Sequence, residues 1–208
     1  MKIRYFFLSL LLALLALASP AAAAQNNNEQ QAKKMLMQAY NKVFGAQGCF
    51  LRYDAHLSFF FHSKGWASMK KGKYAYDDTK THGWCDGKNY YYLDRKKKEV
   101  QILNGHSAKN GSVMDKFTFH PDDYSYRWAS TKEGYVITIK AKKNVSGVKT
   151  AKVLLDRKTQ NPLRISVRIA FLWAKVDISQ FRQGNINDSI FYFPRNKYKD
   201  YKIVDKRK

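Results

Sequence analysis

The strongest structural signal in this 208-residue chain is a period-two alternation of apolar and polar side chains. From 163 to 171, apolar residues alternate with Arg164, Ser166 and Arg168, and a second alternation covers 51–59. Successive side chains of a β-strand point to opposite faces of its sheet, so each segment predicts a strand with one apolar face. Such a face must be covered, which limits the fold to a sheet packed against another layer.

Shorter apolar runs separated by turn residues predict further strands. The pair Asp86-Gly87, for example, is typical of a tight turn between 82–85 and 88–93. Residues 104–123 lack periodicity and predict a long irregular connection, with one short helix near 112–117. The predicted strands, about ten in number, are 51–59, 66–76, 82–85, 88–93, 100–103, 135–140, 153–155, 163–171, 172–178 and 201–204.

Ahead of the first strand, residues 32–44 follow the spacing of an amphipathic helix, and Gly45 is a typical helix stop. The apolar positions of this helix are Ala32, Met35, Leu36, Ala39, Tyr40, Val43 and Phe44. The sequence therefore predicts a mainly β fold with helices (α+β), in which a helix covers the apolar face of an antiparallel sheet.

The N-terminus has the pattern of a secretory signal peptide. Lys2 and Arg4 precede an apolar run over 5–18, and small residues over 19–24 form a cleavage site. The run is shorter than the roughly 20 residues that cross a bilayer, and no second such run follows, so we expect no transmembrane anchor. The predicted organisation is a signal peptide over 1–24 and one domain over 25–208, which a bacterium would export to the periplasm.

The chain is strongly basic, with a formal net charge of +22 at pH 7. An exported protein does not meet nucleic acid, and the lysines are spread along the chain instead of gathering on one recognition helix. Two interpretations remain. The excess charge is either a solvated exterior or a means of approaching anionic lipid or lipopolysaccharide.

The two cysteines, Cys49 and Cys85, are candidates for one disulfide because the expected compartment is oxidising. In an antiparallel meander the two cysteines lie near the same end of their strands, with one strand between them. Their separation is then about 10 Å, which is too far for a disulfide unless the intervening strand stops early. Buried free thiols are the alternative. Without a CxxC pair, a redox role is not expected.

No pattern for catalysis is present. The five histidines lack metal-ligand spacing, there is no GxSxG elbow, and the adjacent acids Asp77-Asp78 and Asp122-Asp123 are typical of turns. Aromatic triplets such as 90–92 point their rings to opposite faces of a strand, which favours packing over a stacking platform for ligands. We expect no enzymatic activity, no cofactor and no metal site.

The order of several short motifs resembles the periplasmic outer-membrane lipoprotein carrier family (LolA-like proteins). In that family a strand ends in Lys-Arg-Pro, an aromatic strand follows, and an Asp-Gly-Lys turn leads into further aromatic residues. The matching stretches here are 69–76 (MKKGKYAY) and 86–94 (DGKNYYYLD). The close of the chain, 190–194 (IFYFP) and 201–207 (YKIVDKR), is similar to the family's F-x-F-P … V-x-D-x-R ending.

This resemblance implies an incomplete antiparallel β-barrel with a helical lid over an apolar cavity, in which acyl chains of a lipoprotein cross the periplasm. It implies a monomer whose partners are lipoproteins or other acylated lipids and transfer proteins at the inner and outer membranes. Where the better-known carriers have a lid-latching arginine, this chain has Lys70. Lysine cannot make the same forked contacts, so the resemblance implies a weaker or absent latch and a divergent member.

Two functions are compatible with this sequence: a carrier of acyl chains, and an envelope lipid-binding or sensing module without transport activity. The same apolar residues could also simply pack a closed core. The residues predicted to line the cavity are Leu51, Tyr53, Leu57, Phe59, Tyr74, Tyr76, Ile137, Ile139, Leu163, Ile165 and Val167. Met35 and Leu36 are predicted to belong to the lid.

Overall fold

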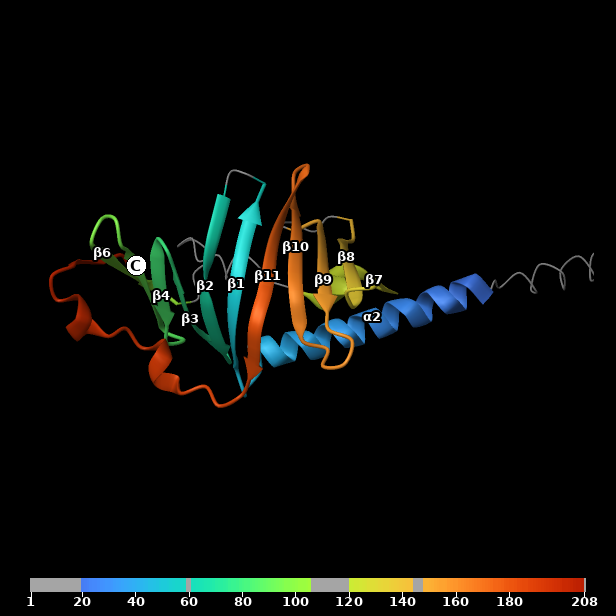
Figure 1. Ribbon diagram of the computed structural model, residues 1–208, viewed down its shortest axis with the longest axis horizontal. Coiled ribbons are helices and arrows are strands. Elements are labelled where there is room, and N and C mark those ends of the chain that lie inside the picture. The colour runs from blue at the N-terminus through green and yellow to red at the C-terminus, as the bar shows by residue number, and fades with distance from the viewer. Residues whose placement is uncertain (1–19, 59–60, 106–119, 144–147, 208) are drawn as a thin grey trace, which may run out of the picture.

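One twelve-stranded sheet forms the body of the protein in the computed structural model, which describes residues 20–58, 61–105, 120–143 and 148–207 (Figure 1). The strands are β1 (Cys49–Leu57), β2 (Phe61–Lys70), β3 (Lys73–Asp78), β4 (Thr81–Cys85), β5 (Asn89–Asp94), β6 (Glu99–Asn104), β7 (Tyr124–Ser130), β8 (Tyr135–Ala141), β9 (Thr150–Leu155), β10 (Pro162–Ile169), β11 (Leu172–Gln183) and β12 (Lys202–Asp205). Their order across the sheet is β12-β6-β5-β4-β3-β2-β1-β11-β10-β9-β8-β7.

Strands β7 and β12 lie at opposite edges and do not pair with each other, so the sheet is an open, incomplete barrel. Neighbouring strands run antiparallel except for β12, which pairs parallel with β6. The predicted fold class, a mainly antiparallel sheet with a helical cover, is confirmed. Three short 3-10 helices, η2 (Pro121–Asp123), η3 (Asp188–Phe191) and η4 (Arg195–Tyr198), complete the described structure.

Two strand predictions were wrong in detail. The single strand predicted over 66–76 is split into β2 and β3 by a tight turn at Lys71 and Gly72, which both have positive φ values of 42° and 78°. Strand β7 was not predicted, although its aromatic residues alternate with polar ones. The short helix predicted near 112–117 lies outside the described residues.

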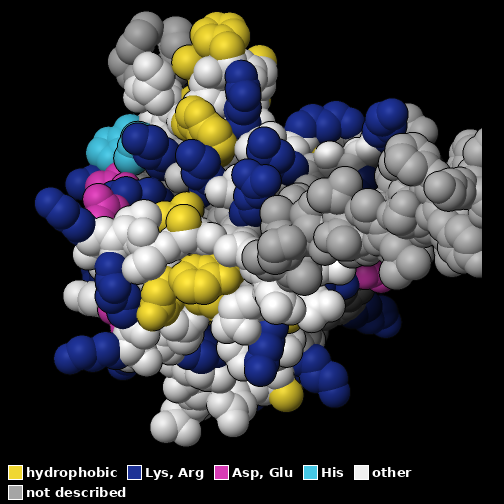
Figure 2. All heavy atoms as spheres, turned by 90° about the vertical axis from the view of Figure 1, so that its right-hand side faces the viewer, with side chains coloured by type: hydrophobic (Ala, Val, Ile, Leu, Met, Phe, Trp, Pro, Cys, Tyr) yellow, Lys and Arg dark blue, Asp and Glu magenta, His cyan; other side chains and the backbone are white. Residues whose placement is uncertain are grey.

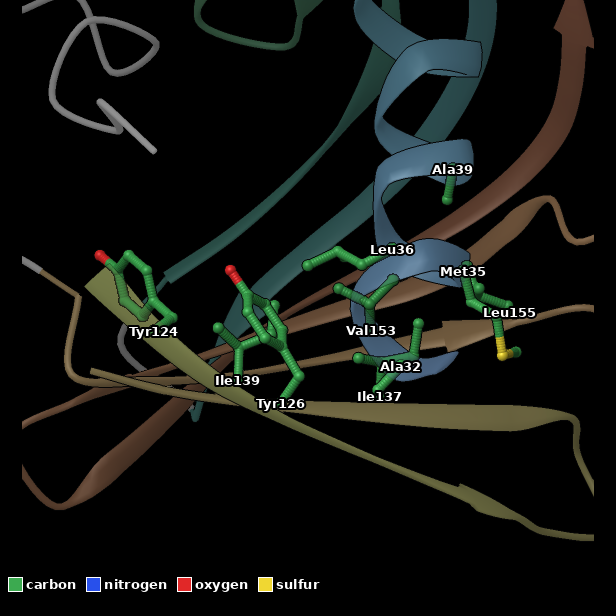
Figure 3. Close-up of a cluster of buried hydrophobic side chains, with 10 residues drawn as sticks. All are labelled: Ala32, Met35, Leu36, Ala39, Tyr124, Tyr126, Ile137, Ile139, Val153 and Leu155. Atoms are coloured by element: carbon green, nitrogen blue, oxygen red, sulfur yellow. The ribbon is translucent and has the colours of Figure 1, made fainter. Parts of the chain in front are cut away.

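Helix α2 (Pro20–Phe44) covers one face of the sheet, which we call the inner face. In Figure 3 its side chains point at those of β7, β8 and β9. This first cluster consists of Ala32, Met35, Leu36, Ala39, Tyr124, Tyr126, Ile137, Ile139, Val153 and Leu155. Among the described residues, no helix is both long and apolar enough to cross a membrane.

Polar side chains of α2 also occupy the free edge of the sheet. The amide of Asn28 donates to the backbone carbonyl of Trp128 (3.2 Å) and accepts from its N–H (3.0 Å), and Glu29 accepts from the N–H of Tyr126 (3.3 Å). An exposed edge strand would offer these groups to another chain. The helix therefore protects β7 as well as covering the sheet.

The last turn of α2 covers a second cluster on the inner face. Register places Cys49, Met69, Tyr74, Cys85, Tyr90 and Leu103 in one row across β1 to β6. All six are buried together with Leu51, Val43 and Ile178. Beside Met69 and Tyr74 of this row, the Lys71 N–H donates to the Phe44 carbonyl (3.2 Å), which ties the end of α2 to the β2–β3 turn.

The opposite, outer face of β3 to β6 is covered by the chain between β11 and β12, residues 184–201, which we call the C-terminal segment. The third cluster, fully or nearly buried, consists of Ala75, Trp84, Leu93, Val100 and Phe191. Phe193 stacks on Tyr91 with ring centroids 5.0 Å apart. This half of the sheet is thus covered on both faces.

One carboxylate anchors the C-terminal segment. Asp188 accepts from the Nζ atoms of Lys70 (2.7 Å) and Lys73 (2.6 Å), and Lys70 also donates to the carbonyl of Ile186 (3.1 Å). Hydrogen bonds from Lys70 and then Lys73 lower the pKa of Asp188 from its ordinary 3.8 to about 2. Because the carboxylate is bound in its charged form, its contribution to stability is complete above its ordinary pKa of 3.8 and is lost as the pH falls through about 2.

We therefore expect an Asp188→Asn variant to hold its C-terminal segment less firmly at pH 7 and to show a smaller acid-induced change between about pH 4 and pH 2. Near-ultraviolet circular dichroism monitors this, since Phe193 and Tyr198 of the segment are in ring contact with Trp84 of the sheet. Asp200→Asn, at an exposed carboxylate of the same segment, is the matched control. An unaltered acid transition in Asp188→Asn would show that another group governs it.

Candidate functional site

Beside α2 the inner face is covered, but none of the described residues fully covers it toward the other end of the long central strands. Leu57 pairs with Ala174, and Ala174 pairs with Val167, so these three side chains form one row across β1, β11 and β10. Ala55 lies one row nearer the helix. We call Ala55, Leu57, Val167 and Ala174 the open strip. All four are only partly buried and belong to none of the three clusters.

The open strip continues into the covered core without a break. Ala55 pairs with Val176, which pairs with Ile165, and both partners pack against the second cluster. In Figure 1 the tall strands β1, β2, β10 and β11 rise above the level at which α2 crosses the sheet. The apolar face is therefore longer than the helix that covers it, and the uncovered part can accept an apolar ligand.

Tyrosines lie on the inner face of β1, β3 and β5, and of these Tyr53, two residues before Ala55 on β1, is nearest the open strip. The hydroxyls of Tyr76 and Tyr90 are 2.8 Å apart, and burial raises the pKa of both side chains. Burial, and then the charge of Asp78, raises the pKa of Tyr53 to about 12. At neutral pH these side chains are therefore uncharged phenols, which can donate hydrogen bonds to the polar end of a ligand.

Glycines lie beside two of these tyrosines on the neighbouring strands. A Cβ atom at Gly83 would lie 2.2 Å from the ring of Tyr76, and one at Gly65 would lie 3.0 Å from the hydroxyl oxygen of Tyr53. At Gly83 the absence of a side chain leaves room for the ring of Tyr76. At Gly65 the nearer contact would be the Asp77 carbonyl oxygen, 2.1 Å away, so the neighbouring backbone is the main reason for glycine there.

The predicted lining residues fall into two groups. Leu51, Tyr74, Ile137 and Ile139 are buried in the first and second clusters, where they pack the core beneath α2. The other group is only partly buried: Leu57 and Val167 belong to the open strip, and Tyr53, Tyr76 and Ile165 pack against the second cluster. Met35 and Leu36 are buried against the sheet, in the position predicted for a lid.

Of the two remaining predicted residues, Leu163 lies at an irregularity in the β9–β10 pairing and belongs to no cluster. Phe59 lies outside the described residues, so its prediction is untested. Sequence reasoning passed over Ala55 and Ala174, which are in the open strip. Both alanines stand at inner-face positions of the alternating pattern, but alanine is a weaker hydrophobic signal than leucine or phenylalanine.

The structure corrects the expectations for Lys70 and the cysteines. Lys70 points to the outer face and anchors the C-terminal segment through Asp188, so it is not a latch for α2. Cys49 and Cys85 are buried and are not joined by a disulfide, and two strands lie between them instead of one. Burial raises the pKa of the Cys49 thiol to about 12, which disfavours its reactive thiolate form.

The two hollows beside α2 are lined mainly by polar residues. One, of about 540 Å³, is lined by Asn27, Asn28, Gln30, Gln31, Lys34 and Trp128. Another, of about 230 Å³, is lined by Glu29, Ser125, Tyr126, Arg127, Thr138 and Lys140. Neither corresponds to the predicted apolar cavity. Among the described residues, the apolar surface that remains partly uncovered is the open strip.

Among the described residues, the histidine with the most strongly shifted pKa lies far from the open strip. His82 is sandwiched on the outer face between Trp84, with ring centroids 3.7 Å apart, and Trp66, at 5.8 Å. Burial lowers the pKa of His82 to about 4, against the opposing charge of Asp77. In the part of the chain that the structure describes, no group of three or more His, Cys, Asp or Glu side chains could hold a metal ion.

No known family profile matches the sequence, and no curated protein is similar enough to count as a match. Solved structures do match. An uncharacterized conserved protein from Thermus thermophilus is similar over 85% of this chain and 99% of its own, with a TM-score of 0.59 and 11% identity. A LolA superfamily protein from Nitrosomonas europaea covers 78% of this chain and 97% of its own (TM-score 0.37, 11% identity). For the lipoprotein LppX from Mycobacterium tuberculosis the shares are 76% and 98% (TM-score 0.44, 9% identity).

The Thermus structure, the one of these three with a TM-score above 0.5, shows that the open sheet with its covering helix is a fold already seen in a solved protein. At these identities the likeness is one of fold.

Proposed function

We propose that this protein is a periplasmic, non-enzymatic carrier that binds the acyl chains of lipoproteins or of a related lipid and moves them towards the outer membrane. The observation that carries this proposal is the open strip: an apolar surface continuous with the core that no described residue covers completely. In this proposal residues 1–24 are a cleaved signal peptide and 25–208 form the carrier domain.

Shielding an acyl chain requires an extended apolar surface. Moving a 14-carbon chain into water costs on the order of 11 kcal/mol, at about 0.8 kcal/mol per CH₂. The rows from Ile165 and Val176 to Val167, Ala174 and Leu57 supply such a surface along the strands. The small side chains at Ala55 and Ala174 leave room for a chain to lie against the sheet.

Tyrosines of the inner face, of which Tyr53 is nearest the open strip, supply the polar half of the site in this proposal. A lipid has an ester or amide where its acyl chains end, and the phenols of Tyr53, Tyr76 and Tyr92 can donate hydrogen bonds to carbonyl oxygens there. Such a pairing avoids burying an unsatisfied polar group of the ligand. The arrangement supports a lipid with a polar linkage over a plain hydrocarbon.

The proposal is tested by extracting lipids from protein purified out of the periplasm of the native organism and identifying them by mass spectrometry. We expect acylated species in about stoichiometric amount, and none with a Leu57→Glu variant purified in the same way. Protein that is folded but consistently empty, and that also fails to take up a fluorescent fatty acid, would overturn the proposal. A bound lipid that is never passed to acceptor membranes would instead favour the sensing module.

A further inference from the structure

Large hydrophobic side chains are exposed at one end of the sheet. Among the described residues, five large hydrophobic side chains are exposed, and three of them lie on two neighbouring hairpins. These are Phe171 (81% exposed), Ile169 (52%) and Phe61 (48%), which we call the hairpin tips. Exposed apolar groups gathered at one place mark an interaction surface more often than scattered ones do.

The two tips are held side by side by the sheet. Leu57 pairs with Phe61 on one side and with Ala174 on the other, so the β1–β2 and β10–β11 hairpins are directly hydrogen-bonded neighbours. They form the top of the molecule in Figure 1. Ala170, between Ile169 and Phe171, has a positive φ of 52°, which makes the turn tight. Phe171, which follows directly in this turn, is 81% exposed.

Cationic side chains predominate around the tips. Residues 55–58, 61–64, 148–153 and 165–176 contain no Asp or Glu. Asp54, just outside these segments, is paired with Lys64 at 2.9 Å. Figure 2 shows hydrophobic side chains at the top of the molecule with Lys and Arg side chains directly below them. The cations in these segments are Lys64, Lys149, Lys152, Arg168 and Lys175.

We propose that the hairpin tips are a docking surface for anionic lipid bilayers, into whose interface Phe171, Ile169 and Phe61 insert. Apolar side chains at an interface gain by burial at the level of the headgroups, while nearby cations gain by attraction to anionic lipids. The hairpin tips supply apolar side chains and nearby cations. Their positive charge complements an anionic membrane and would repel a cationic surface. A bilayer is thus the occupant that matches this surface.

Docking here would also orient the open strip. Leu57 and Val167 lie within one or two rows of the tips, so the open end of the apolar face meets the bilayer surface first. This inference goes beyond acyl-chain carriage and does not depend on it, because a protein could dock through its tips without taking up any lipid.

The test is cosedimentation of the full mature chain with vesicles of phosphatidylcholine alone and with phosphatidylglycerol added. We expect binding to the anionic vesicles, weakened by salt, and little binding to phosphatidylcholine. The double substitution Ile169→Ser with Phe171→Ser should lower the affinity at least about tenfold, and Lys152→Glu with Lys175→Glu should remove the preference for anionic lipid. Tyr192→Ser, at a side chain that is 53% exposed elsewhere, is the matched control.

Thermal unfolding of each variant establishes that it is folded, and uptake of a fluorescent fatty acid from solution separates docking from carriage. Tip variants are expected to keep that uptake. Equal vesicle binding by wild type and both double variants would overturn the proposal. So would concentration-dependent self-association that disappears in the tip variants, because it would assign the surface to a second copy of the chain.

Discussion

Replacing Leu57 with glutamate is expected to abolish acyl-chain binding while the fold persists. Leu57 is partly exposed and outside the three clusters, so a carboxylate there remains hydrated in the empty protein. An acyl chain lying on the open strip would have to cover that charge, which costs several kcal/mol when no partner compensates it. We expect affinity to fall at least about a hundredfold, or roughly 2.7 kcal/mol.

The matched control is His56→Glu, one residue earlier on the same strand. Successive residues of β1 point to opposite faces, so this glutamate would lie on the outer face. It changes the net charge in the same direction without touching the open strip. Titration with a fluorescent fatty acid measures both variants, and circular dichroism monitors their fold. Equal affinities for Leu57→Glu and the parent would remove the open strip as the binding site.

The face of each strand was predictable because alternation depends only on local sequence. Leu57 and Val167 were assigned to the inner face from their parity, and the structure places both there. The covering helix was predictable for the same reason, since Met35 and Leu36 repeat with the helical period. These signals required no knowledge of which strands pair.

Alternation failed where both faces are covered. Trp66 and Ala75 lie on the outer face under the C-terminal segment, while Met69 and Tyr74 on the inner face lie under α2. With apolar residues on both faces the period-two pattern disappears. That is why 66–76 was taken for one strand and the turn at Lys71 was missed.

How much of the inner face α2 covers was not predictable either, because it depends on contacts between distant parts of the chain. The sequence of residues 32–44 does not determine whether the helix packs over Ile137 or over Leu57. The structure selects the first through contacts such as Asn28 with Trp128 and Lys33 with Asp122, 2.7 Å apart. The division of the predicted lining residues into core and open surface follows from that placement.

Truncating Phe191 to alanine is expected to be among the most destabilising single changes in the protein. Phe191 belongs to the C-terminal segment and is fully buried against the outer face, in the cluster with Trp84 and Leu93. Phenylalanine-to-alanine substitutions at such sites cost about 3 to 5 kcal/mol, through lost transfer energy and the cavity left behind. For a chain of this length the midpoint of thermal unfolding should fall by roughly 10 °C.

Tyr192→Ala provides the comparison, because the adjacent Tyr192 is 53% exposed and has Lys73 Nζ 5.9 Å from its ring centre. We expect that variant to lose no more than about 1 kcal/mol. Calorimetry of both variants decides whether the C-terminal segment belongs to the cooperative fold. A small effect at Phe191 would mean that the segment detaches without unfolding the sheet, and the outer face of β3 to β6 would then itself be a surface open to partners.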